Sequence, residues 1–223
     1  MGFLDSFEAA IFDLDGTLID SMPLWDRLCS DWLVSLNKIP EAGLETDIAV
    51  MTVSQSADYV NSHYALAISK EELIAQWEEI MMERYLKAAP LKQGVRELLQ
   101  ALAERMSLGV ATYSFPRPCE AILQHHKIRS YFSSILYAHE FELVSQFSSV
   151  KKDPLFWRTA AAQLGVIPEK CIVFEDSFSS LEGVHAAGMS LAAVFDPSCS
   201  NWPDLSKAAD LVLNYPGEAL NYS

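Results

Sequence analysis

The spacing of apolar residues divides the chain into two kinds of sequence. In the first kind, short apolar runs alternate with stretches in which apolar residues recur every three or four positions, as on one face of a helix. The runs predict strands at 9–12, 108–112, 135–137, 171–174, 191–195 and 211–213, and the stretches predict helices at 94–105, 120–127, 154–164 and 181–187. Strands that alternate with helices indicate an α/β fold, in which helices cover both faces of a parallel sheet.

The segment at 18–90, between the first two strands, shows helical spacing only. Helices are expected at 24–36, 57–64 and 70–89. Pro23 suits a first helical turn, and residues 69–72 have the spacing of a capping box. A lone buried strand has no partners, so residues 1–17 must join the sheet formed by residues 91–223. Residues 18–90 are therefore predicted to be a small helical domain inserted into this core.

Carboxylates directly follow two of the predicted strands. Asp13 and Asp15 come after the first strand, and they share one face because residues two apart on an extended chain point the same way. Glu175 and Asp176 follow the strand at 171–174. Ligand sites of open parallel sheets lie beyond the carboxyl ends of the strands, so both pairs are candidates for one site. Like charges in such a place repel unless they share a cation or a proton, and this cost indicates a function.

Hydroxyl and ammonium groups complete the candidate site. The strand at 108–112 ends in Thr112, and Tyr113 and Ser114 follow it; these residues offer hydroxyl and N–H groups suited to phosphate oxygens. Lys151 and Lys152 precede a predicted helix. Each feature alone has a plainer explanation, as a turn cap, a helix cap or a solvated charge. Together, at strand ends, they are the components of a phosphoryl-transfer site, in which Mg²⁺ uses one or two carboxylates and the substrate phosphate.

Composition narrows the classes of partner. The 223 residues carry a formal net charge of -14, which argues against nucleic acid and anionic membrane surfaces, because both attract basic patches. Half of the residues are hydrophobic, which allows a substantial core, and no apolar run reaches membrane-spanning length. The four cysteines are scattered and the first residues do not resemble a signal peptide, so we expect reduced thiols and a cytoplasmic location. A monomer or weak homo-oligomer is expected.

The motifs resemble those of the haloacid dehalogenase superfamily of phosphohydrolases. Four motifs of that family have counterparts here, in chain order: Asp13-Leu14-Asp15-Gly16-Thr17, Thr112, Lys151 and Glu175-Asp176. The resemblance covers the whole chain. Within the superfamily, the chain is similar to the beta-phosphoglucomutase-like phosphatases, in which a helical cap follows the first strand. It implies a Rossmann-like three-layer core with a parallel sheet and an inserted α-helical cap.

The resemblance also implies a role for each site residue. Asp13 would be the nucleophile that forms an aspartyl phosphate, and Asp15 would protonate the leaving alcohol and then activate water. Mg²⁺ would bind Asp13, the backbone carbonyl of Asp15, and Asp176, with Glu175 and Ser114 nearby. The residues implied to bind phosphate are Gly16, Thr17, Thr112, Tyr113 and Lys151. Of these, Thr112 and Lys151 are also implied to be catalytic, together with Asp13 and Asp15.

Departures from the family pattern leave alternatives open. The family usually has Gly-Lys-Pro where this chain has Val150-Lys151-Lys152, so either lysine could enter the site, although Lys151 places Asp153-Pro154 in register. The glycine and arginine that hold a second phosphate in the phosphomutase are not evident near residues 51–53. We therefore expect a Mg²⁺-dependent phosphatase of small phosphorylated metabolites, sugar phosphates among them. The alternatives are a sugar phosphomutase and, more remotely, a non-catalytic ligand-binding module.

Overall fold

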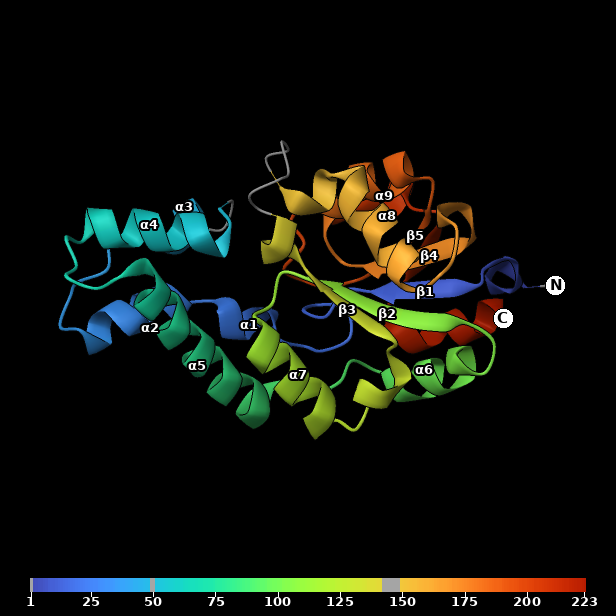
Figure 1. The fold of residues 1–223 in the computed structure, drawn as a ribbon, viewed down its shortest axis with the longest axis horizontal. Helices are drawn as coiled ribbons and strands as arrows, with labels where there is room; N and C mark the ends of the chain where they lie inside the picture. Colours follow the sequence, from blue (N-terminus) through green and yellow to red (C-terminus); the bar gives the residue numbers. More distant parts are fainter. Residues whose placement is uncertain (1, 49–50, 142–148) are drawn as a thin grey trace.

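A parallel sheet runs through the larger end of the molecule (Figure 1). The computed structural model describes residues 2–48, 51–141 and 149–223. Within these residues, six strands pair in the order β3-β2-β1-β4-β5-β6, and every pairing is parallel. They are β1 (Ala9–Phe12), β2 (Ser107–Thr112), β3 (Ser134–Tyr137), β4 (Cys171–Glu175), β5 (Ser190–Val194) and β6 (Leu211–Leu213). The predicted α/β fold with a parallel sheet is confirmed, and each predicted strand is present with small shifts at its ends.

The first strand lies in the middle of the sheet, where its neighbours fix the residues that follow it. β1 pairs with β2 on one side and with β4 on the other, and Ile11 is level with both Gly109 and Val173. The Asp13 backbone N–H then donates to the Phe174 carbonyl at 3.0 Å, so pairing continues past the end of β1. Since the strands are parallel, the residues after β1, β2 and β4 meet at one edge of the sheet.

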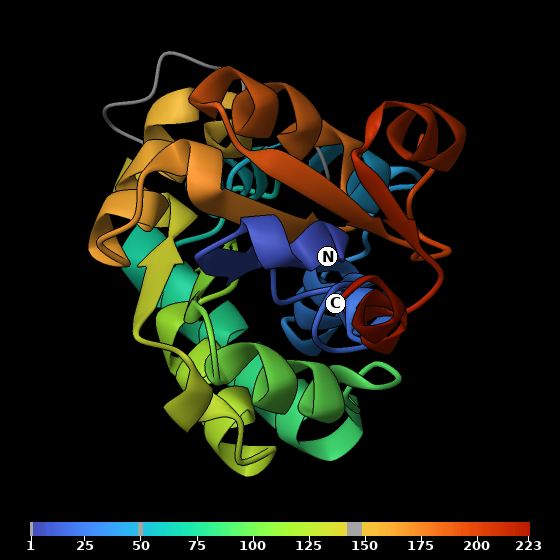
Figure 2. The ribbon, with the colours of Figure 1, turned by 90° about the vertical axis from the view of Figure 1, so that its right-hand side faces the viewer.

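Helices cover both faces of the sheet, as the end-on view in Figure 2 shows. Ala10 and Phe12 pack on one side and Ala9 and Ile11 on the other, because successive strand residues point to opposite faces. The first side holds α6 (Val95–Ala103) and α7 (Pro116–His125), and the second holds α8 (Pro154–Gln163), α9 (Leu181–Ala187) and α10 (Trp202–Ala208). The apolar pattern does not predict α10, since Leu205 alone among its residues is buried.

The segment between β1 and α6 is helical, and most of it lies beyond one end of the sheet (Figure 1). It contains α1 (Met22–Trp25), α2 (Leu28–Ser35), α3 (Leu44–Ile48), α4 (Val53–His63) and α5 (Lys70–Ala88). The prediction of a single helix at 24–36 is wrong, because the chain breaks at Arg27, which has a left-handed φ of 62°. Arg84 of α5 donates to the Leu24 carbonyl at 2.6 Å and to the Asp26 carbonyl at 3.2 Å. These carbonyls therefore have a hydrogen-bond partner from another helix at the point where α1 ends.

The chain leaves the sheet region and returns to it at one point. Ile19 and Leu91 form an isolated antiparallel bridge. Beside it, the Asp20 N–H donates to the Pro90 carbonyl at 2.9 Å, and the Lys92 N–H donates to the Leu18 carbonyl at 3.0 Å. The predicted division into a core (1–17 and 91–223) and a cap (18–90) stays a prediction. Residues 1, 49–50 and 142–148 of these ranges lie outside the described residues.

Candidate active site

The turn after β1 brings the first motif against the end of β4. Asp13 is buried, and Gly16 has a left-handed φ of 81°. A Cβ at Gly16 would lie 2.3 Å from the Asp176 carboxylate, so a larger residue would displace that side chain. Thr17 is buried beside it and donates through Oγ1 to Asp176 Oδ1 at 3.0 Å. Glycine is needed here for both the backbone conformation and the space.

Lys151 lies between carboxylates from two strand ends. Its Nζ donates to Asp13 Oδ1 at 2.5 Å and to Glu175 Oε1 at 2.6 Å, and the side chain is 4% exposed. Burial lowers the pKa of Lys151, but the charges of Asp13 and Glu175 outweigh this and raise it above its usual value. The lysine that contacts Asp13 is Lys151, and the two neighbouring carboxylates favour its protonated form.

Two helices fix the loop that carries this lysine. The Trp157 indole of α8 donates to the Lys151 carbonyl at 2.8 Å. Gly183 of α9 lies so near that a Cβ there would be 2.2 Å from the same carbonyl. Lys152, the other candidate from the sequence, is half-buried and lines two cavities, both of which Asp176 also lines.

Three buried carboxylates could hold a cation. Asp13, Glu175 and Asp176 each offer an oxygen, and these oxygens lie within 4.8 Å of one another. Burial raises the pKa of Asp13 to about 8, although the Lys151 ammonium opposes the shift. Burial and the neighbouring Glu175 charge raise the pKa of Asp176 well above its usual value. Crowded, desolvated carboxylates of this kind fit a hard divalent cation, which would neutralise them.

Asp15 occupies a different environment from Asp13. Its Oδ1 accepts hydrogen bonds from Ser21 Oγ at 2.6 Å, from Trp25 Nε1 at 3.0 Å and from the Tyr85 hydroxyl. Burial raises the pKa of Asp15, and these three donors oppose that shift. Sequence reasoning missed all three donors. Tyr85 belongs to the apolar stripe of α5 and lies far from Asp15 in sequence, so nothing in the pattern distinguishes it from a core residue.

The residues after β2 connect the candidate site to α5 and to the lysine loop. Buried Thr112 accepts from the Ser114 N–H at 2.9 Å, as a turn cap would, and Ser114 Oγ lies 3.0 Å from the Tyr85 hydroxyl. The Tyr113 hydroxyl accepts from the Lys151 backbone N–H at 3.3 Å, and the Tyr113 ring lies 5.6 Å from Lys151 Nζ. The residues predicted from the sequence therefore lie at the same edge of the sheet, and Asp13, Asp15, Tyr113, Lys151, Glu175 and Asp176 line one cavity there. Their individual roles remain predictions.

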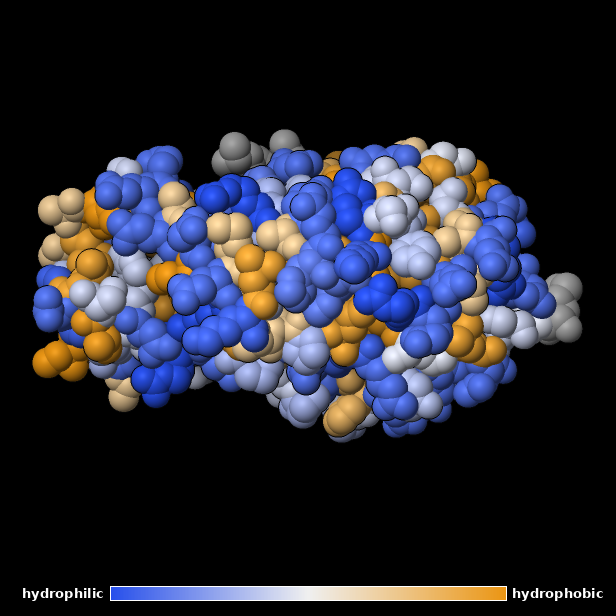
Figure 3. Space-filling model, turned by 90° about the horizontal axis from the view of Figure 1, so that it is seen from below, coloured by the Kyte–Doolittle hydropathy of each residue, from blue (hydrophilic) through white to orange (hydrophobic). Residues whose placement is uncertain are grey.

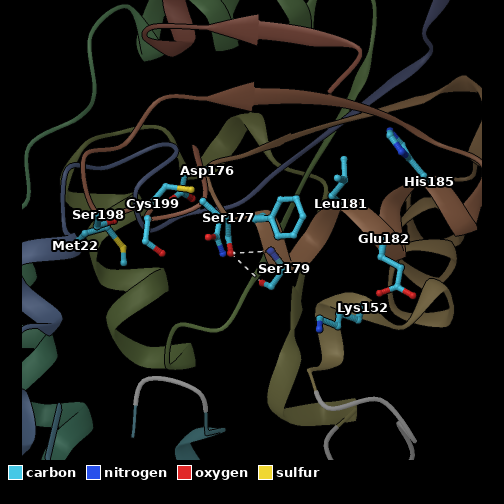
Figure 4. A pocket seen from close by; sticks show the side chains of 13 residues that line it. Met22, Lys152, Asp176, Ser177, Ser179, Leu181, Glu182, His185, Ser198 and Cys199 are labelled. Carbon is cyan, nitrogen blue, oxygen red and sulfur yellow. Dashed lines mark hydrogen bonds between the residues drawn. The ribbon is translucent and has the colours of Figure 1, made fainter. Parts of the chain in front are cut away.

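A cavity of about 720 Å³ lies between the helical segment and this sheet edge and is called the catalytic cavity below. Asp13, Asp15, Lys151 and Asp176 line its core side. A second cavity of about 700 Å³ adjoins it at Asp176 and is shown in Figure 4. The volume of the catalytic cavity lies in the range usual for small-molecule sites.

The comparisons with known proteins agree with this geometry. Residues 10–194 match the family model described as haloacid dehalogenase-like hydrolase. The chain belongs to this family. Among the haloacid dehalogenase-like hydrolases it is similar to "Hexitol phosphatase B" of Escherichia coli (strain K12), at 30% identity over 87% of this chain and 86% of that protein. It is also similar to the "Phosphorylated carbohydrates phosphatase" of Thermotoga maritima, at 26% identity over 96% of this chain and 97% of that protein.

A solved structure extends the likeness to the whole fold. The structure described as a putative beta-phosphoglucomutase from Thermotoga maritima superposes with a TM-score of 0.72, at 26% identity, over 96% of this chain and 97% of that one. The predictions of membership in the haloacid dehalogenase superfamily and of a phosphohydrolase are confirmed. Among the helices of residues 2–48, 51–141 and 149–223, none combines the length and apolar content needed to span a bilayer.

Proposed function

We propose that this hydrolase is a Mg²⁺-dependent phosphatase that acts on phosphate monoesters of small metabolites, sugar phosphates among them. The observation that carries the proposal is the position of Asp13, a buried carboxylate 2.5 Å from the Lys151 ammonium at the end of a cavity. The names of the two curated relatives, a hexitol phosphatase and a phosphatase of phosphorylated carbohydrates, support the substrate class.

The proposed reaction has two steps. In the first, a carboxylate oxygen of Asp13 attacks phosphorus, the bond to the ester oxygen breaks, and Asp15 gives its proton to the leaving alkoxide. In the second, water attacks phosphorus of the aspartyl phosphate and Asp15 takes a proton from that water. Inorganic phosphate leaves, and Asp13 is again a carboxylate. Lys151 reduces the repulsion between Asp13 and the phosphate in both steps.

The residues at the sheet edge suit a divalent cation in this reaction. Asp13, Asp176 and the backbone carbonyl of Asp15 would hold Mg²⁺, and Glu175 lies beside them. When bound, the cation supplies positive charge to the phosphate oxygens. Glu175 also accepts from Lys151, from the Ser177 N–H and from Ser180 Oγ, so it orients the lysine as well.

The test replaces the proposed nucleophile. Asp13→Asn keeps the volume of the side chain but cannot form the phosphoenzyme, so phosphate release from sugar phosphates should fall by about a thousandfold or more. Phosphate release by purified protein, with Mg²⁺ present, is the measurement. Asp20→Asn is the matched control, because Asp20 is exposed and lies a few residues further along the same segment.

Three outcomes would contradict the proposal in different ways. Phosphate release by Asp13→Asn near the parent rate would remove the nucleophile assignment. No release by the parent, but interconversion of sugar monophosphates with a bisphosphate activator, would favour the phosphomutase alternative. Binding of phosphorylated compounds without any turnover would favour the binding module.

A further inference from the structure

The two walls of the catalytic cavity differ in chemistry. The core wall carries Asp13, Lys151 and the other groups expected to act on phosphate. The opposite wall, called the cap wall below, is formed by side chains from residues 22–77. Many of these are apolar, including Leu28, Ile48 and the buried Trp77. The part of the substrate that leaves as an alcohol must therefore contact the cap wall.

Charge on the cap wall has one sign. Among the described residues that line it there is no Lys, Arg or His, whereas Asp26 and Glu45 are carboxylates. Residues 49–50 and 142–148 contain no basic residue in the sequence. The two lysines of the cavity, Lys151 and Lys152, both come from the core, and Figure 4 shows Lys152 among the side chains of the second cavity.

Arg84 and Arg27, two arginines near the cap wall, are paired with other groups; Arg27 donates to Asp31 Oδ1 at 3.2 Å and does not line the cavity. Arg84 donates to the Leu24 carbonyl at 2.6 Å and to Asp31 Oδ2 at 2.8 Å, and it does not line the catalytic cavity. Glu45 lines the cavity while its Oε1 accepts from the Ser30 N–H at 2.8 Å, which fixes it at the start of α2. A second anionic group on the substrate would meet this fixed carboxylate without a counter-ion on the cap wall.

An aromatic pair lies beside the proposed acid/base. The rings of Trp25 and Phe115 are stacked, with centroids 5.8 Å apart and an interplanar angle of 21°. The hydrogen bond from Trp25 Nε1 to Asp15 fixes the orientation of the indole. Aromatic faces are negative, so they attract C–H groups and cations and repel anions. This surface suits the uncharged carbon face of a polyol or a sugar.

We propose that the cap wall selects phosphate monoesters whose alcohol part carries no negative charge, with Glu45 and Trp25 as the residues that determine the selection. Esters that carry a carboxylate or a second phosphate would be disfavoured. The inference rests on the proposed phosphatase function and specifies which leaving alcohols the enzyme accepts, according to their charge.

The test compares esters that share a carbon skeleton. Glucose 6-phosphate is paired with 6-phosphogluconate and with glucose 1,6-bisphosphate, and glycerol 3-phosphate with 3-phosphoglycerate. In each pair, we expect kcat/KM for the ester with an uncharged alcohol part (the neutral partner) to exceed that for the ester with an additional carboxylate or phosphate (the anionic partner) by roughly tenfold or more. The reason is that like charges at close range are strongly unfavourable. Added KCl should narrow the difference, since salt screens this repulsion.

Glu45→Gln tests the named residue. The amide oxygen can still accept from the Ser30 N–H, so the start of α2 is preserved, but the charge is lost. The ratio of kcat/KM between neutral and anionic partners should fall by roughly threefold or more, mainly through KM. Asp47→Asn is the matched control, because it removes one charge from an exposed position of the same helix that does not line the cavity.

The outcomes separate this inference from the proposed function. Equal turnover of neutral and anionic partners by the parent would overturn the inference alone. A ratio that changes no more in Glu45→Gln than in Asp47→Asn would overturn the assignment to Glu45. No phosphate release from any of these esters would overturn the proposed function and the inference with it.

Discussion

Three donors converge on one oxygen of Asp15, and each comes from outside the first motif. Ser21 and Trp25 follow it in sequence, whereas Tyr85 lies near the end of α5 and also contacts Ser114. Within the described residues, no side chain donates to the second oxygen, Oδ2. In the proposed mechanism, Oδ2 would therefore be the oxygen that exchanges a proton with the substrate.

Removal of one of these donors should affect proton transfer selectively. We expect Tyr85→Phe to lower kcat for an ordinary sugar phosphate by roughly tenfold to a hundredfold, because Asp15 loses one of the three hydrogen bonds that orient its carboxyl group. Acetyl phosphate, whose leaving group needs no proton, should be affected less. Steady-state kinetics with both substrates checks this, and Tyr59→Phe on α4 is the control. An equal loss with both substrates would show a structural role for Tyr85.

At the residue scale, the charged groups of the candidate site could be predicted from the sequence, but the hydrogen-bond donors to Asp15 could not. Asp13, Lys151, Glu175 and Asp176 meet because they follow strands or precede a helix at one sheet edge, and a rule about strand ends locates them. Tyr85 occupies an ordinary position in an apolar helical stripe. Its contact with Asp15 depends on how α5 packs against the core, and periodicity carries no such information.

At the scale of elements, α5 connects the helical segment to the core. It packs against α1, α2 and α4 and also against α7 of the core. Its Arg84 binds the carbonyls that would otherwise continue α1 into α2, together with the Asp31 carboxylate. The break between these two helices is therefore stabilised from another element, which is why the apolar spacing alone predicted one helix.

The contribution of Arg84 can be measured directly. Arg84→Ala removes several charge-assisted hydrogen bonds from a side chain that is mostly buried, so we expect a loss of about 2 kcal/mol in the free energy of unfolding. Urea denaturation with Lys87→Ala as a control on the same helix checks this. A loss no larger than that of the control would mean that the break between α1 and α2 is stable without the arginine.

The strands were predictable because each is a short apolar run with polar residues at its ends. Cys171–Glu175 is fully buried, and its last residue, Glu175, belongs to the candidate active site. By contrast, α10 and α3 are short and each buries a single side chain, Leu205 or Leu44, so they leave no periodic signal. Short helices of this kind depend on tertiary contacts more than on their own sequence.

At the scale of the whole molecule, the protein carries a large excess of acidic over basic residues. The net charge of -14 includes the buried cluster of Asp13, Glu175 and Asp176, and hydrophilic residues cover much of the face in Figure 3. A cation that binds this cluster relieves local repulsion and stabilises the folded state. At Mg²⁺ about a hundredfold above its Kd, Tm should rise by about 5–10 °C.

Calorimetry or thermal fluorescence with and without EDTA measures this shift. Asp176→Asn should raise Tm in the absence of metal, because one crowded carboxylate is removed, and it should reduce the response to Mg²⁺. Asp204→Asn on α10 is an exposed control. If Tm of the parent is the same in Mg²⁺ and in EDTA, the carboxylate cluster does not bind the metal.

The bridge between Ile19 and Leu91 has an evolutionary consequence. Since the chain departs and returns through adjacent residues, the stretch between them can change in length and sequence while the sheet edge keeps its geometry. Glu45 lies within that stretch, whereas Asp13, Lys151 and Asp176 lie outside it. Descendants of one ancestral gene could thus acquire new substrates by variation in one continuous stretch of coding sequence, while selection preserves the proposed catalytic residues elsewhere.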